Sequence, residues 1–244
     1  MKVAPGACIY PAGLDENGSF HDAGTLGLGV LGPNGEALAL TAAHVVGSLS
    51  AAHGAEQTEV LLRRDVAPGS GDPRLGFVRT SHPPEPCDDI EIDASLVELR
   101  DGVEAGHILR ENQTSARPLN LDGISDEIVV HKRGMTIPHL TSGILDPDPR
   151  SLVISMTGGP SREYVRGFYV HGTDATPFAK PGDSGAIVVD EDDCVVGMIV
   201  AVKLSSPASW TPEPDDPAFV VSMTDILGAL DFRLPGADRE CTER

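Results

Sequence analysis

The sequence is poor in basic residues, aromatic residues and cysteine, and it has no long hydrophobic run. Only 18 lysines and arginines oppose 37 aspartates and glutamates, which gives a net charge of −19. A surface of this charge repels a phosphate backbone, so we expect no nucleic-acid partner. No stretch approaches the roughly 18 apolar residues that are needed to span a membrane, so we expect no membrane partner either.

Aromatic residues make up 4% of the chain, although hydrophobic residues make up 40%. The core must therefore consist mainly of valine, leucine, isoleucine and alanine. The 27 glycines and 20 prolines are spread along the chain, which is typical of many short strands joined by turns. A length of 244 residues suits one compact unit or two small halves packed together.

Strand-like segments recur along the whole chain. Apolar residues in 25–31 and 37–41 flank a Gly-Pro-Asn-Gly-Glu sequence, which predicts a β-hairpin. Residues 224–230 predict a short C-terminal helix, with Ser222 or Thr224 as its N-cap. The other predicted strands are 59–63, 75–80, 94–99, 127–132, 139–145, 152–157, 165–171, 185–189, 193–203 and 218–222.

Three residues of complementary chemistry each stand in a short motif. His44 ends the sequence Thr-Ala-Ala-His, Asp93 begins Asp-Ala-Ser-Leu, and Ser184 lies in Gly-Asp-Ser-Gly. A serine hydroxyl is a weak nucleophile that needs a base within hydrogen-bond reach and a third group that orients the base. The chain order His, Asp, Ser differs from the orders found in subtilisins and in α/β-hydrolases.

These motifs, in this order, resemble those of trypsin-like serine proteases of the chymotrypsin fold, over about residues 20–232. The resemblance implies an all-β fold of two packed six-stranded antiparallel Greek-key barrels with a short C-terminal helix. We therefore expect residues 1–20 to form a lead-in and residues 21–115 to form a first barrel with the histidine and the aspartate. Residues 116–244 would form the second barrel, with the serine and the helix.

The resemblance also implies a catalytic role for each motif. Ser184 is the expected nucleophile and His44 the general base. Asp93 would fix the tautomer of the imidazole and stabilise the imidazolium. Asp93 precedes an apolar strand, as the aspartate of the family does, whereas the nearby Asp88 and Asp89 lie in a more polar stretch.

The nucleophile motif carries two further expectations. The backbone N–H groups of Gly182 and Ser184 match the oxyanion hole of the family. Asp183 is the carboxylate that trypsin-like zymogens pair with a newly cut N-terminus, whereas bacterial relatives use a basic side chain. Lys132 falls on the position of that basic residue, and Arg133 is the alternative. A buried carboxylate needs such a partner because its desolvation is costly.

Two residues indicate the specificity of the expected enzyme. Phe178 falls on the position at the base of the primary specificity pocket, where trypsin has an aspartate. Val202 falls where many relatives have a glycine. Together they predict a shallow apolar pocket and cleavage after apolar residues. Ordinary core packing of Phe178 is the alternative.

The cysteines and the N-terminus bear on location. Secreted relatives usually have a cysteine beside the catalytic histidine, but Val45 follows His44 here. Cys194 lies in an apolar strand, where a buried thiol is common. The N-terminus has no apolar signal-peptide segment. We therefore expect reduced thiols and a cytoplasmic protein, with a recloned mature form of a secreted protein as the alternative.

No histidine or cysteine spacing typical of a metal site occurs, so we expect no cofactor. Weak calcium binding by Asp146 and Asp148 is an alternative, although a solvated loop accounts for them better.

The sequence therefore predicts a serine endopeptidase that acts on a protein or peptide substrate, with any regulatory partner undetermined. A catalytically silent, protease-shaped binding module is the main alternative. A protease-chaperone of the HtrA type, which normally carries an added PDZ domain, is a third. The acidic surface fits simple solubility, or attraction of a basic substrate segment.

Overall fold

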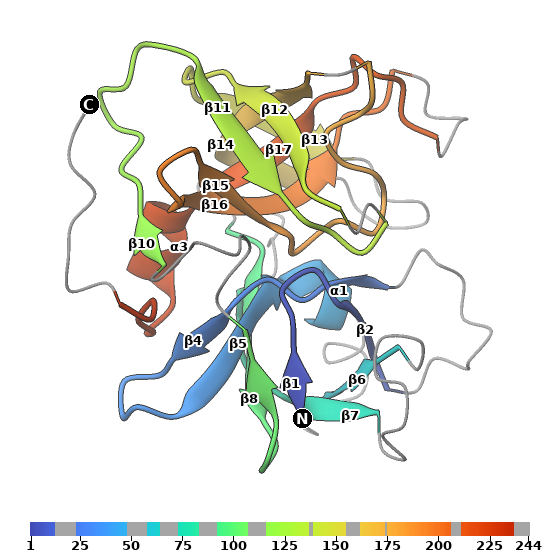
Figure 1. Cartoon of the computed structure of the whole chain (residues 1–244), viewed down its shortest axis with the longest axis vertical. Coiled ribbons are helices and arrows are strands. Elements are labelled where there is room, and N and C mark those ends of the chain that lie inside the picture. The colour runs from blue at the N-terminus through green and yellow to red at the C-terminus, as the bar shows by residue number, and fades with distance from the viewer. Residues whose placement is uncertain are drawn as a thin grey trace.

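The computed structural model consists of two β-barrels stacked on each other, with the earlier part of the chain in the lower one (Figure 1). Among the described residues the only helices are α1 (Ala43–Gly47) and α3 (Met223–Ala229), which confirms the all-β class. Neither helix has the length and apolar character that crossing a membrane requires. The described residues are 1–12, 23–47, 58–63, 73–82, 92–106, 116–136, 139–154, 162–173, 175–205 and 211–236.

The first barrel is a seven-stranded sheet that begins and ends on one segment of the chain. Its end strands, β3 (Gly24–Thr25) and β4 (Gly29–Leu31), follow each other directly in the sequence, so the sheet curves round to meet itself. The runs predicted at 37–41, 59–63, 75–80 and 94–99 each form one strand, whereas the run at 25–31 is divided between β3 and β4. The remaining strands, in sheet order, are β2 (Cys8–Pro11), β6 (Glu59–Leu62), β7 (Arg74–His82), β8 (Ala94–Leu99) and β5 (Ala37–Ala42).

The second barrel is a closed ring, because β17 pairs with both β14 and β16. A closed ring has no free sheet edge. The strands in ring order are β16 (Cys194–Val202), β15 (Ile187–Asp190), β11 (Ile128–Lys132), β12 (Thr141–Leu145), β14 (Arg162–Gly172) and β17 (Ala218–Ser222). Outside the ring, β13 (Arg150–Ile154) pairs with β14, β10 (Arg117–Pro118) pairs with β16, and β1 (Lys2–Val3) pairs with β9 (Glu104–Ala105).

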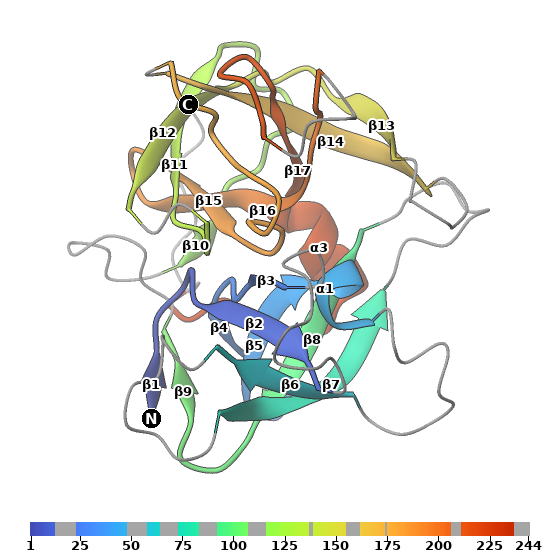
Figure 2. The same cartoon turned by 90° about the vertical axis from the view of Figure 1, so that its right-hand side faces the viewer.

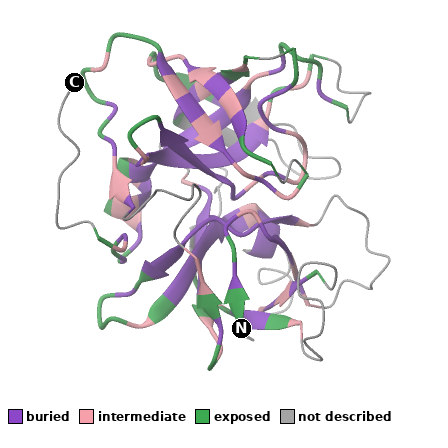
Figure 3. Ribbon diagram, viewed as in Figure 1, coloured by how far each residue is buried: buried purple, intermediate pink, exposed green. Residues whose placement is uncertain are grey.

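The core is aliphatic, as the scarcity of aromatic residues predicts. Buried positions run along both barrels and through the region between them (Figure 3). The first core cluster includes Ile9, Leu40 and Val97 of the first barrel, and also Ile226 of α3 and Phe232. The C-terminal segment therefore returns to pack on the first barrel, and Leu31 forms a β-bridge with Arg233.

Helix α3 begins as predicted. The Ser222 hydroxyl accepts a hydrogen bond from the Asp225 N–H at 3.0 Å, which satisfies one of the unpaired amides of the first turn. The prediction for the N-terminal part of the chain differs from the structure, because the expected lead-in, residues 1–20, contains β2. This strand pairs with both β3 and β6, so it is part of the first barrel.

The prediction of reduced thiols is wrong for Cys194, which is disulfide-bonded. This cysteine is buried at the start of β16, as the sequence predicts, but it is a half-cystine and not a free thiol. Disulfides persist mainly in oxidising compartments, so the cysteine argument for a cytoplasmic location no longer holds.

Candidate active site

His44 and Asp93 come together because their strands are paired. Strands β5 and β8 are antiparallel, and Ala42 lies opposite Ala94 in their register. Asp93, which directly precedes β8, therefore lies beside the end of β5, from which the chain continues to His44. The chain turns into α1 directly after β5, so His44 lies in the first turn of a helix.

Asp93 binds His44 at two atoms. One carboxylate oxygen accepts the His44 backbone N–H at 2.8 Å, and the other lies 2.5 Å from Nδ1. Asp93 is fully buried and has a φ of 45°, in the left-handed region that aspartate adopts more readily than most residues. Because a carboxylate only accepts, Nδ1 carries the hydrogen, which leaves the Nε2 lone pair free to take a proton.

Ser184 lies in the loop between β14 and β15, at the boundary between the barrels. Its carbonyl oxygen accepts the Thr25 N–H at 2.8 Å, and its hydroxyl donates to Val200 O at 3.4 Å. Gly185 must be glycine, because a Cβ there would lie 2.1 Å from Thr25 O and 3.2 Å from Ala42 N. This close approach brings the serine loop against the end of β5, two residues before the histidine.

Gly182 has a conformation that few other residues adopt. Its φ is +101°, and a Cβ would lie 2.5 Å from Met135 Cε and 2.9 Å from Thr136 Cγ2. Its carbonyl oxygen accepts a hydrogen bond from Thr25 Oγ1 at 2.9 Å. The amide of the next residue, Asp183, donates to Lys180 O at 2.9 Å.

The Asp183 carboxylate, beside the expected nucleophile, forms a fully buried ion pair with Lys132 Nζ. It also accepts hydrogen bonds from Thr136 N at 2.9 Å, Thr136 Oγ1 at 2.6 Å and Lys180 N at 3.1 Å. Burial lowers the pKa of Lys132 below its ordinary 10.5, and the charge of Asp183 acts in the opposite direction. The carboxylate thus has the charged partner and the donors that its burial requires.

Arg133, the alternative partner, lies elsewhere. It is half-buried beside Gly6, and its Nε is buried without a hydrogen-bond partner among the described residues. The N-terminal ammonium of Met1 donates to Gly102 O, at the opposite end of the first barrel from the serine loop (Figure 1). Lys132 is therefore the cation that the structure places on Asp183.

The two expected pocket residues differ in exposure. Phe178 is fully buried and packs in the core of the second barrel, where a Cβ on Gly143 would lie 2.6 Å from its ring. Val202, at the end of β16, is half-buried and packs against the same core. Asp146 and Asp148, the weak calcium candidates, both pair with Arg150, at 3.2 and 3.5 Å.

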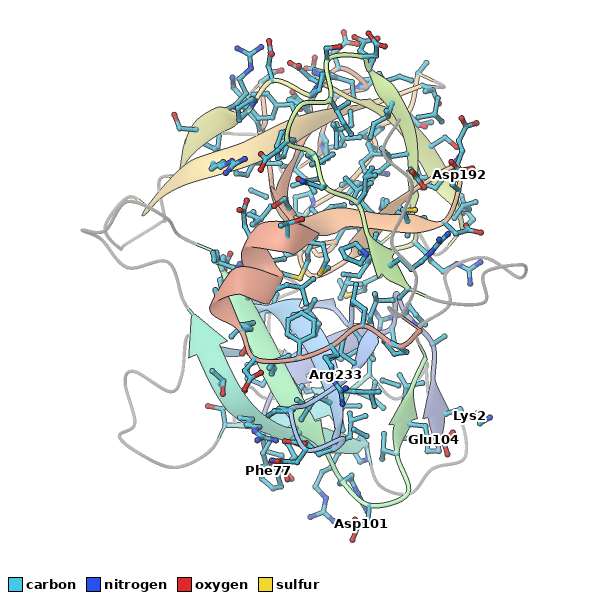
Figure 4. The ribbon with its side chains drawn as sticks, turned by 90° about the vertical axis from the view of Figure 1, so that its left-hand side faces the viewer. Lys2, Phe77, Asp101, Glu104, Asp192 and Arg233 are labelled. Atoms are coloured by element: carbon cyan, nitrogen blue, oxygen red, sulfur yellow. The ribbon has the colours of Figure 1, made fainter. Side chains whose placement is uncertain are left out.

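A separate surface cavity of about 310 Å³ lies on the first barrel. Phe77 and Asp101, two of its lining residues, are at the outer end of that barrel, with Lys2 and Glu104 nearby and Asp192 far off on the second barrel (Figure 4). The full lining set is Glu59, Arg74, Gly76, Phe77, Arg100 and Asp101.

Thr25 is the site residue that the sequence motifs missed. It is fully buried in β3 and hydrogen-bonds to both Gly182 and Ser184. No motif marks a threonine within an apolar strand segment, and only the pairing of the two barrels brings it to the serine loop.

No protein-family model and no curated protein sequence matches the chain. Solved structures do match it. A protease from Nocardiopsis has a TM-score of 0.61 at 17% identity, over 96% of this chain and 100% of that one. Protease A of Thermobifida fusca has a TM-score of 0.61 at 12% identity, over 96% and 99%. A glutamic-acid-specific serine protease has a TM-score of 0.59 at 18% identity, over 95% and 100%.

At these identities the likeness concerns the fold, and it agrees with the closed ring of six strands, the curved seven-stranded sheet beside it and the short C-terminal helix. The chain therefore has the two-barrel, trypsin-like fold of bacterial serine proteases.

Proposed function

We propose that the protein is a serine endopeptidase. The observation that carries this proposal is the buried Asp93 carboxylate, which binds the ring and the backbone of His44. This contact fixes the imidazole in the tautomer whose Nε2 can accept a proton, which is what a general base requires. The serine loop supports the proposal, because it packs against the strand that leads to this histidine.

The proposed reaction is acyl transfer. Ser184 Oγ turns from Val200 O toward His44 Nε2, loses its proton to the imidazole and bonds to the scissile carbonyl carbon. Asp93 stabilises the imidazolium, and the N–H groups of Gly182 and Ser184 bind the oxyanion. The imidazolium then gives its proton to the leaving amine. Water, activated by His44, hydrolyses the acyl-enzyme and restores the serine.

We propose that the substrate is a protein or peptide cleaved after an apolar residue. Phe178 supports this part of the proposal because it has no charge. A trypsin-type pocket has a carboxylate at the corresponding position. A buried cationic side chain without such a partner is costly. Acidic surface loops can still attract basic segments of the substrate at more distant subsites.

The second candidate function is a silent binding module of protease shape. The hydrogen bond from the Ser184 hydroxyl to Val200 O favours it, because a hydroxyl held there is turned to a backbone carbonyl. The two candidates differ in one chemical property, which is whether the imidazole activates the serine.

A fluorophosphonate probe tests this property directly, since it labels only an activated serine. The native protein, Ser184→Ala and heat-denatured protein are incubated with the probe, and the labelled residue is identified by mass spectrometry. We expect labelling of Ser184 in the native protein alone. A folded native protein that stays unlabelled would contradict the endopeptidase proposal and favour the binding module.

A further inference from the structure

Thr25 lies where the two barrels meet, in the short strand β3 (Figure 2). It belongs to the first barrel, yet its side chain and its backbone N–H both bind the loop that carries Ser184. A single residue that connects the two barrels at this loop can control the geometry of the loop.

The Thr25 hydroxyl makes two hydrogen bonds of opposite direction. It donates to Gly182 O at 2.9 Å and accepts the Met135 N–H at 3.1 Å. The one hydroxyl hydrogen is used on Gly182, and a lone pair receives Met135. Thr25 itself is fully buried, whereas its partners Gly182 and Met135 are half-buried.

The backbone of Thr25 holds the same loop from a second point. Its N–H donates to Ser184 O at 2.8 Å, and its own carbonyl oxygen accepts the Thr41 hydroxyl at 2.8 Å. Thr41 lies in β5, which leads to the histidine. A chain of hydrogen bonds therefore runs from β5 through Thr25 to both residues whose N–H groups are the proposed oxyanion donors.

Gly182 needs such a restraint more than other residues do. Without a Cβ it has a wide choice of backbone conformations, and its φ of +101° is one of many that it can adopt. A hydrogen bond on its carbonyl oxygen limits rotation of the peptide plane that follows. Donors to an oxyanion are effective only when they are held in place before the charge develops.

We propose that Thr25 is a positioning residue for the oxyanion hole. Its hydroxyl fixes the peptide plane between Gly182 and Asp183, which links the two proposed N–H donors, and its backbone N–H holds the carbonyl of Ser184. This inference rests on the proposed function. Loss of the hydroxyl should slow reaction at Ser184 while leaving initial binding of a reagent nearly unchanged, because the oxyanion interaction develops during the reaction.

The test uses saturation kinetics of the fluorophosphonate probe, which separate the maximal labelling rate from the half-saturating concentration. Thr25→Val keeps the shape and removes the hydroxyl, whereas Thr25→Ser keeps the hydroxyl. We expect the maximal rate of the valine variant to fall about 10- to 100-fold, less than the loss of a whole oxyanion donor. The half-saturating concentration should stay within about twofold, and the serine variant should recover most of the rate.

A matched control separates positioning from general loosening. Ser222→Ala removes the N-cap of α3, also a buried hydroxyl in a hydrogen bond, but one whose partner Asp225 lies in α3 and not in the serine loop. It should lower the melting temperature and leave both kinetic constants unchanged. Thr25→Cys, whose thiol is a weak donor, replaces the valine variant if that variant is not recovered folded. Its rate should then lie well below that of Thr25→Ser.

Each outcome is decisive. A folded Thr25→Val protein labelled at the native rate overturns the positioning role and leaves the proposed function intact, and so does equal slowing in Ser222→Ala. A native protein that is itself unlabelled overturns the proposed function, and the catalytic part of this inference with it.

Discussion

Asp93 and His44 are joined at two points, by a bond of 2.8 Å to the backbone amide and one of 2.5 Å to the ring. The carboxylate thus takes up an unpaired amide at the start of α1 and fixes the ring tautomer at the same time. The Asp93 side chain therefore sets both the start of α1 and the orientation of the imidazole.

Asp93→Asn should abolish most of the activity without unfolding the protein. The amide keeps the shape of the carboxylate, but it can donate to Nδ1 and so favours the wrong tautomer of His44. We expect the labelling rate at Ser184 to fall about 10⁴-fold. Asp122→Asn, an acid-to-amide change at an exposed residue that pairs with Arg166, is the control and should leave the rate unchanged. Comparable rates in the two variants would contradict the role of Asp93.

Gly182→Ala should impair both the fold and the reaction. A Cβ would meet Met135 Cε at 2.5 Å, and the φ of +101° would strain an alanine. We expect a loss of about 1–2 kcal/mol in the free energy of unfolding, measured by urea denaturation, together with slower labelling. The double variant Gly182→Ala/Met135→Ala relieves the contact with Met135, but it leaves the backbone strain and the 2.9 Å approach to Thr136 Cγ2, so it should recover only part of the loss. Full recovery would show that φ is unimportant here.

Lys132→Met should be strongly destabilising, because it leaves the buried Asp183 carboxylate without its cation. We expect a loss of about 3–5 kcal/mol in the free energy of unfolding. Arg133→Ala is the neighbouring control and should cost far less, because the Arg133 Nε makes no hydrogen bond within the described structure. The double variant Lys132→Met/Asp183→Leu should regain part of the stability, since it buries no unpaired charge, although Thr136 and Lys180 lose their acceptor. The opposite ranking of the two single variants would assign the pairing to Arg133.

The stability of the protein at alkaline pH should reflect the lowered pKa of Lys132. Between that pKa and the ordinary 10.5, the unfolded chain holds a proton on this lysine that the folded chain has lost. The free energy of unfolding contributed by this residue therefore rises with pH across this window, by about 1.4 kcal/mol for each unit by which the pKa is lowered. Lys132→Arg does not titrate there, so the native protein should gain stability relative to it as the pH rises toward the ordinary lysine pKa of 10.5. A constant difference in urea denaturation would contradict the shift.

Cleavage should follow apolar residues and not arginine or lysine. At the expected pocket position the side chain is Phe178, which offers no carboxylate. Selectivity among apolar side chains should be modest, because one methylene is worth only about 1–3 kcal/mol. A mixed peptide library, read by mass spectrometry with Ser184→Ala as the blank, measures the preference. Dominant cleavage after arginine or lysine would show that another residue forms the base of the pocket.

Much of the fold is determined locally by the sequence. Short apolar runs between turn residues predict the strands, because a strand buried on both faces reads as a continuous apolar run with a turn at each end. The cap of α3 is narrowed to Ser222 or Thr224 for the same reason, since a cap involves residues three apart, and the structure has Ser222. Strand β2 was missed because Cys8–Pro11 is short and its partners are strands distant in the sequence.

The site divides in a similar way. His44, Asp93 and Ser184 can be proposed from their motifs, since the chemistry restricts the residue types at each position. The tertiary structure decided four other features. These are the cation that binds Asp183, the helix that contains His44, the burial of Phe178 and the disulfide at Cys194. Thr25 is the clearest case. Its importance comes from hydrogen bonds across the boundary between two barrels, and such contacts depend on how separately formed sheets pack, which no local pattern of residues records.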